Sequence, residues 1–107
     1  MTGTDAAANP VRGEATLMVR GERRVLRPSF AALVAAEDEL GPLFALVERA
    51  GTGQLSLAEM TALFWHCLTD RTGLTRDDVG DSMLHSGLAA SAVPLRALLG
   101  AILQGRG

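Results

Sequence analysis

The spacing of apolar residues changes at Pro28, and this change limits the possible folds more than any other feature of the sequence. Before it, Ala15, Leu17 and Val19 occupy every second position, which is typical of a strand with one buried face. From Ser29 onward, apolar residues recur every three or four positions, as in amphipathic helices. The sequence therefore predicts an α+β fold that is mainly α, with its strands at the N-terminal end.

The two strand-like runs predict a β-hairpin that turns around Gly21 and Glu22. Gly21 at the first turn position suits a type II′ turn, whose twist matches that of paired strands. Residues 23–27 would return antiparallel, and Pro28 would end the ladder because it has no amide hydrogen to donate. Since a two-stranded hairpin is only marginally stable alone, we expect it to pack on a bundle of four to five short helices.

The first two predicted helices are separated by Gly41 and Pro42, which stop one helix and start the next. Ser29 is a favourable N-cap for the first of them. The predicted core-facing residues are Phe30, Leu33, Val34 and Leu40 in the first helix, and Leu43, Leu46, Val47 and Ala50 in the second.

Three more helices are predicted after residue 53. Ser56 and Glu59 form a capping box for the third, and the Thr75–Asp78 stretch caps the fourth, which would end near Ser86. The predicted core stripes are Met60, Leu63, Phe64, Cys67 and Leu68 in the third helix, and Val79, Met83 and Leu84 in the fourth. A last helix would start at about Ser91, hold Pro94 in its first turn, and place Leu95, Leu98, Leu99, Ile102 and Leu103 on one face.

Length and composition predict one globular domain. The chain has 107 residues, of which 48% are hydrophobic and 21% charged. Residues 1–10 are small and polar and are predicted to be a flexible N-terminal arm, with residues 11–107 forming the single domain. No signal peptide is recognised, and no stretch approaches the about 18 apolar residues of a membrane span, so a cytoplasmic location is expected.

The segment "GTGQLSLAEM", residues 51–60, resembles the second half of a calcium-binding EF-hand loop. In that alignment Glu59 takes the closing position and Glu48 the first, but Ala50 and Thr52 stand where a calcium loop offers further carboxylates or amides. One or two carboxylates cannot replace the water shell of the ion. The capping box accounts for Glu59 without a metal. We therefore expect a turn followed by a helix start.

Cysteine and histidine usage gives little support to catalysis or cofactor binding. His66 and Cys67 are adjacent, His85 is the other histidine, and there is no second cysteine, so a zinc tetrad is unavailable. A Cys–His nucleophilic pair would need the two groups to meet in space. Because Cys67 lies on an apolar stripe, a buried inert thiol is favoured. We expect no cofactor and no enzymatic activity.

Two charged clusters favour structural interpretations. The acids of "AAEDEL", residues 35–40, point around a helix, which favours solvation or pairing with arginines, and Glu37 is expected to be partly buried against an arginine. The arginines in or beside the hairpin form a basic patch on a chain of net charge −2, and they are Arg12, Arg20, Arg23, Arg24 and Arg27. Without interleaved aromatic residues, this patch favours a protein-facing or edge-guarding function over nucleic-acid binding.

Trp65 is the only tryptophan, and it lies off the stripe of its helix. It is expected to pack at the rim of the core under the hairpin or the last helix. The alternative is an exposed anchor for a partner, because tryptophan is frequent at interface hot spots.

Several stretches in order resemble a known family: "RGE" at 12–14, "LRPSFAALVAAEDELG" at 26–41, "LSLAEMTALFWHCL" at 55–68 and "LTRDDVGDSMLHSGL" at 74–88. The pattern resembles the small tail proteins of phage-like gene transfer agents, which are grouped with phage tail assembly chaperones. The resemblance covers about residues 11–104 and lies in the order of helices, the arginine-proline helix entry and the acidic helix end.

This resemblance implies a non-enzymatic tail morphogenesis factor, a chaperone that binds the tape-measure protein, the tail tube protein, or both. The same group is also described as tail tube proteins, so a structural tail subunit is the alternative, and a small nucleic-acid-binding regulator is a third interpretation. Self-association is left open. The residues hypothesised to bind a partner helix are Trp65, Leu95, Leu98, Leu99, Ile102 and Leu103.

Overall fold

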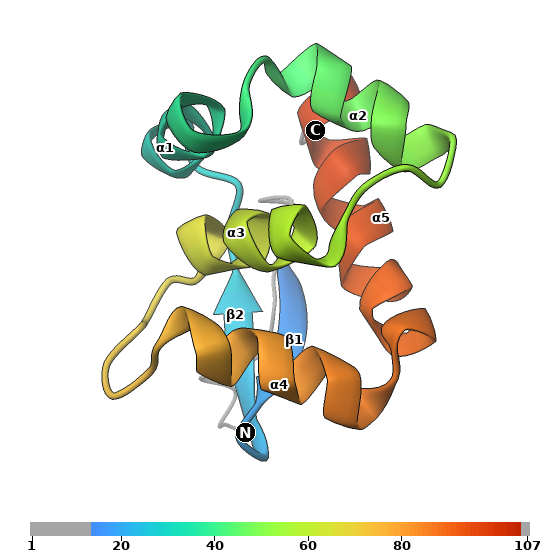
Figure 1. Ribbon diagram of the computed structural model, residues 1–107. Coiled ribbons are helices and arrows are strands. Elements are labelled where there is room, and N and C mark those ends of the chain that lie inside the picture. The colour runs from blue at the N-terminus through green and yellow to red at the C-terminus, as the bar shows by residue number, and fades with distance from the viewer. Residues whose placement is uncertain (1–13, 106–107) are drawn as a thin grey trace.

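The computed structural model describes residues 14–105, which form an antiparallel hairpin followed by five helices (Figure 1). The elements are β1 (Ala15–Val19), β2 (Glu22–Leu26), α1 (Phe30–Leu40), α2 (Leu43–Gly51), α3 (Leu57–Cys67), α4 (Arg76–Ser86) and α5 (Leu88–Gln104). The predicted α+β, mainly α class is confirmed. The expected N-terminal arm, residues 1–10, and Arg12 lie outside the described residues.

The hairpin turn differs from the predicted one. Val19 pairs with Glu22, so the two turn residues are Arg20 and Gly21, with φ values of 54° and 78°. Two consecutive positive φ values define a type I′ turn, in which Gly21 takes the second position rather than the first. The type II′ prediction was wrong because strand pairing continues one residue closer to the turn.

Arg20 adopts a left-handed conformation that is unfavourable for a residue with a β-carbon. We expect Arg20→Asn to raise the free energy of unfolding by about 0.5–1 kcal/mol, since asparagine tolerates this conformation and Asn-Gly suits a type I′ turn. Urea unfolding measures the change, and Arg23→Asn, within strand β2, is a control that should bring no gain. A net loss for Arg20→Asn would show that the contact of Arg20 with Asp78, at 3.8 Å, outweighs the backbone effect.

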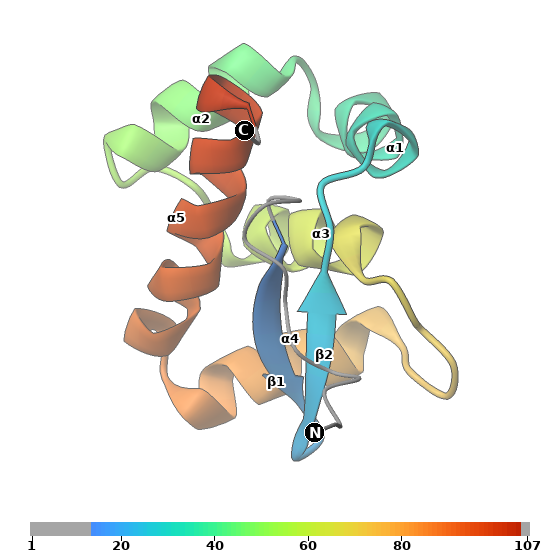
Figure 2. The same cartoon turned by 180° about the vertical axis from the view of Figure 1, so that it is seen from behind.

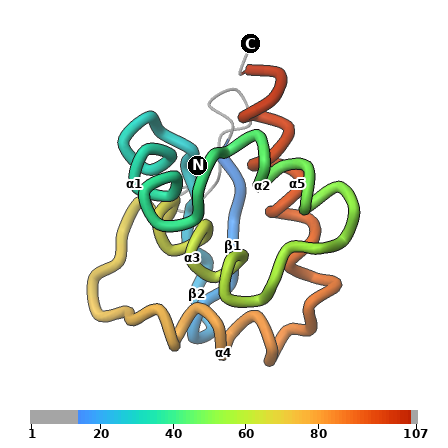
Figure 3. The backbone as a smooth tube through the Cα atoms, turned by 45° about the horizontal axis from the view of Figure 1, so that its top comes forward, coloured from blue at the N-terminus to red at the C-terminus, as the bar shows by residue number. Residues whose placement is uncertain are grey.

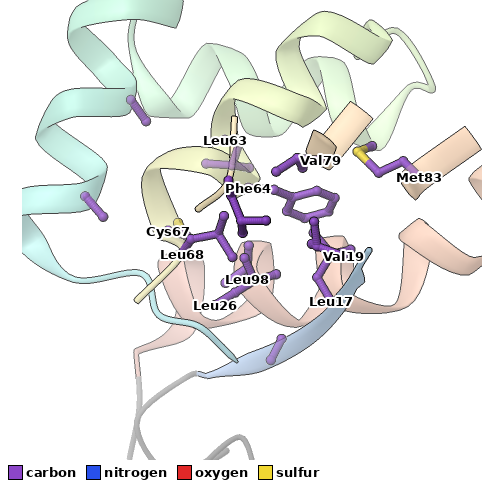
Figure 4. Packing of buried hydrophobic residues seen from close by; sticks show 14 of the residues in the cluster. Leu17, Val19, Leu26, Leu63, Phe64, Cys67, Leu68, Val79, Met83 and Leu98 are labelled. Carbon is purple, nitrogen blue, oxygen red and sulfur yellow. The ribbon is translucent and has the colours of Figure 1, made fainter. Parts of the chain in front are cut away.

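Helix α3 is the centre of the core (Figure 4). Its fully buried Leu63 and Phe64 face the apolar side of the hairpin, and Cys67 is buried beside them. The surrounding buried residues come from both strands, α4 and α5, and they are Leu17, Val19, Leu26, Val79, Met83 and Leu98. The predicted alternation in β1 and the stripe of α3 are therefore confirmed.

Helix α1 buries a different face from the predicted one. Its buried residues are Ala32 and Ala36, while Phe30 is 86% exposed and Val34 is also exposed. Leu33 and Leu40 pack against the core at its margin. Small alanine side chains let α1 lie close to α3, and Phe30 and Val34 therefore face away from the core. Glu37 is exposed as a result.

The predicted helix starts are confirmed where a local hydrogen bond defines them. Both capping boxes are present, at Ser56 with Glu59 and at Thr75 with Asp78. The start of the last helix was predicted wrongly, because α5 begins at Leu88 and Pro94 is buried inside it rather than in its first turn.

The prediction that Leu84 faces the core was also wrong. Leu84 is largely exposed, because the buried line of α4 runs through Val79 and Met83 and Leu84 lies about 100° around the helix from Met83.

Candidate interaction surfaces

The outer edge of strand β2 is already covered by the chain segment that follows α3. Leu26 forms an isolated antiparallel bridge with Leu68. The amide of Arg27 donates to the Cys67 carbonyl at 2.7 Å, and the amide of Thr69 donates to the Val25 carbonyl at 3.0 Å. These bonds leave β2 little edge for another chain.

The outer edge of strand β1 is not paired with another strand within residues 14–105. Thr16 pairs with Val25, whose carbonyl points away from the hairpin and accepts from Thr69. In an antiparallel pair, the backbone groups of Thr16 then also point away from the other strand, and so do those of Met18, two residues later. They have no backbone partner within residues 14–105. Strand β1 contains no charged residue, and α5 lies beside it across a groove of about 200 Å³ (Figure 2). This edge lacks the charges that usually block pairing with another chain.

Most of the hairpin arginines are engaged in ion pairs. Arg20 lies 3.8 Å from Asp78, and Arg27 donates to the buried Glu14 at 2.6 Å. Arg24 donates to Glu22 at 2.9 Å and lies 3.9 Å from Asp70. Arg23 is exposed and makes no ion pair inside the described range. The patch is therefore broken up by acids, which weakens the case for nucleic-acid binding.

The acid-rich end of α1 holds three helices together. The Glu39 carboxylate accepts from both terminal nitrogens of Arg76 at 2.6 Å and lies 2.8 Å from His66 Nε2. Hydrogen bonding to Arg76, followed by that to His66, lowers the pKa of Glu39 to about 2. Glu37 instead accepts from the Leu43 amide at 3.0 Å, so the prediction that an arginine buries it was wrong.

We expect Glu39→Gln to lower stability at neutral pH by about 1 kcal/mol or less, because the Glu39 side chain is partly exposed. The folded pKa lies below the ordinary 4.5, so this stabilisation is present above pH 4.5 and is lost as pH falls toward 2. Urea unfolding of wild type and variant at pH 7 and pH 2.5 measures the difference. Glu48→Gln is the matched control, and an equal wild-type advantage at both pH values would contradict the assignment.

Two potentially reactive side chains, Cys67 and Glu59, are either buried or bound by neighbouring residues. Burial raises the pKa of the Cys67 thiol to about 12, which leaves very little thiolate at neutral pH. The Glu59 carboxylate accepts hydrogen bonds from Arg49 and from the Ser56 amide, and these contacts lower its pKa. Within the described residues, no group of three His, Cys, Asp or Glu side chains is placed to hold a metal ion.

The residues predicted to bind a partner helix differ in how deeply they are buried. Trp65 is half-buried against the core, with the Arg71 guanidinium 5.2 Å from its ring centroid in a cation–π contact. On α5, Leu98 is fully buried and belongs to the core, and the other core-facing residues Leu95, Leu99 and Ile102 are half-buried. Leu103 is exposed. That side of α5 therefore packs partly against the protein itself.

Exposed apolar side chains occur where the sequence did not predict them. Phe30 on α1 and Phe44 on α2 are 86% and 80% exposed, so two of the three phenylalanines lie outside the core. On α5, Val93 is 65% exposed. For Phe44 the signal was available, because it lies off the apolar stripe of its helix.

Within the described residues, no single helix is long and apolar enough to cross a membrane. Helices α4 and α5 pass that test only when joined, and they are bent by 117° at their junction.

The fold and these surfaces define a small, mainly helical α+β domain. Its Cys67 is buried, its Glu59 caps a helix, and its Phe30 and Phe44 are exposed. A family model described as phage tail tube protein, GTA-gp10, matches residues 12–105, and the chain belongs to this family. The resemblance to the tail proteins of gene transfer agents is thus confirmed, but the chaperone function is not. A search of curated proteins found no match, and neither did a search of solved structures.

Proposed function

We propose that this chain is a non-enzymatic structural subunit associated with the tail tube of a gene transfer agent, and that it remains in the finished particle. The observation that carries this proposal is the family match, which spans residues 12–105 and is described as a tail tube protein. The match supports the structural alternative better than the chaperone interpretation favoured by the sequence.

Surface properties support a function in assembly. The outer edge of β1 offers backbone groups that have no backbone partner in the described part of the chain, and Met18 of this strand is exposed. The exposed Phe30, Phe44 and Val93 add apolar area that a neighbouring chain would cover. Apolar residues and aromatic rings of this kind are frequent at the centres of protein interfaces.

The chaperone function remains the second candidate. Phe30 and Phe44 are both strongly exposed, and such aromatic side chains could receive an amphipathic helix of a tape-measure protein. Within the predicted partner-binding set, Leu103 is exposed and Trp65 is half-buried, as are Leu95, Leu99 and Ile102. This function would need a soluble complex that dissociates before the tail is complete.

Co-expression with the tape-measure and tail tube proteins of the same particle, followed by tagged pull-down and size-exclusion chromatography, tests the proposal. A structural subunit is expected to self-assemble or to co-elute with the tube protein. A stable soluble complex with the tape-measure protein, weakened by Phe30→Ser and Phe44→Ser together, would overturn the proposal in favour of the chaperone.

A further inference from the structure

The outward face of α5 is an apolar surface without a cover in the described part of the chain. The helix has 17 residues and a single charge, Arg96. Its core side is formed by Ser91, Pro94 and Leu98, and the opposite side carries Ala89, Val93, Ala97, Gly100 and Leu103 in one line. A helix that is apolar on both sides is normally buried on both, so this second face indicates a binding surface.

A groove that fits such a helix lies between α3 and α4. It has a volume of about 380 Å³, and its lining includes Leu57, Ala58, Thr61, Gly80 and Leu84. The ion-paired Glu39 and Arg76 also line it. Leu57 and Leu84 are exposed, and Ala58, Thr61 and Gly80 contribute small side chains to the lining. A β-carbon at Gly80 would lie 3.7 Å from the Thr61 hydroxyl oxygen, so the two helices approach closely and the groove stays shallow. A shallow floor of small residues suits a helix face built from alanine, valine and glycine.

The charges on the two surfaces are complementary. Asp77 and Asp81 lie one helical turn apart on the rim of the groove, and neither makes an ion pair within residues 14–105. Two like charges at this spacing repel each other, and a cation from another chain would relieve that repulsion. Arg96 is exposed on α5 and makes no ion pair in the same range.

We propose that the outward face of α5 in one copy of this chain binds the α3–α4 groove of a second copy, with Arg96 facing Asp81. None of the residues lining the groove belongs to α5, and the two surfaces lie on different parts of the molecule (Figures 1 and 3). The contact is therefore heterologous, and repeating it produces a ring or a filament rather than a closed dimer. The inference deepens the proposed structural function, since repeated head-to-tail contacts are what a tube-associated subunit would use.

Charge reversal tests the contact in the full chain. Sedimentation velocity over a range of protein concentrations at low salt should show self-association of wild type, and Arg96→Glu or Asp81→Arg should weaken it by about tenfold or more. Asp81 is preferred to Asp77 because Asp77 lies in the first turn of α4, where it also favours the helix. Arg23→Glu reverses another exposed arginine and is expected to leave self-association unchanged.

Mixing the two variants gives the decisive result. Arg96→Glu supplies an acidic α5 and Asp81→Arg supplies a basic rim, so an equimolar mixture is expected to regain association that neither variant shows alone. Circular dichroism confirms that each variant is folded. Wild type that stays monomeric, or variants that associate as wild type does, would overturn the inference. Presence of the protein in purified particles, measured separately, would then still support the structural function.

Discussion

Phe64→Ala is expected to lower the free energy of unfolding by about 3–5 kcal/mol. Phe64 is fully buried at the centre of the core, between the hairpin and α4 (Figure 4). Alanine would leave a cavity that α3 cannot fill, because its neighbouring turns are fixed by other buried residues. A domain of this size is stable by only about 5–15 kcal/mol, so urea denaturation should show a large shift in midpoint.

Phe30→Ala is the matched control for this substitution. The same side chain is removed from a site that is 86% exposed, so the expected change is about 0.5 kcal/mol or less. Similar losses for the two variants would contradict the assignment of Ala32 and Ala36 as the buried face of α1.

Leu98→Ala is expected to destabilise the protein by about 2–4 kcal/mol. Leu98 is fully buried and packs in the core with residues of the hairpin and α3. Leu103→Ala removes the same atoms from the same helix at a site that is 53% exposed, and it should cost less than about 1 kcal/mol.

The order of these two leucine variants reports which face of α5 is buried. Thermal unfolding of both variants, measured in the same buffer, gives the comparison. If Leu103→Ala were the more destabilising substitution, α5 would be rotated relative to the structure, and its outward face could not be the one that carries Val93 and Ala97.

The elements that could be predicted from the sequence are those with local causes. Alternation of Ala15, Leu17 and Val19 is visible within five residues of β1, and the bonds of both capping boxes join residues three positions apart. The stripe of α3 was also clear, because Met60, Leu63, Phe64 and Cys67 recur every three or four positions.

Elsewhere, the buried face depended on contacts between elements. Both sides of α5 are apolar, so periodicity could not distinguish the side of Leu98 from the side of Val93. In α1 the larger residues predicted a face through Phe30, whereas close packing on α3 selected Ala32 and Ala36. Short-range patterns measure apolar content, but they do not measure how closely two helices approach.

The candidate surfaces could be predicted even less well. Glu39 binds Arg76, which is 37 positions away in the chain, and no local pattern links the two. The acidic stretch did suggest pairing with arginines, but not which acid would pair. The α3–α4 groove and the open edge of β1 exist only after the elements have packed, so the sequence alone contains no direct signal for either.

The copy number of this chain in purified gene transfer agent particles tests the structural function most directly. Quantitative mass spectrometry against labelled peptides of this chain and of a known tail protein gives that number. A fixed, stoichiometric number of copies per tail is the result expected for a structural subunit. Particles that package and deliver DNA but contain no copies would contradict it and would support a chaperone that leaves before the tail is complete.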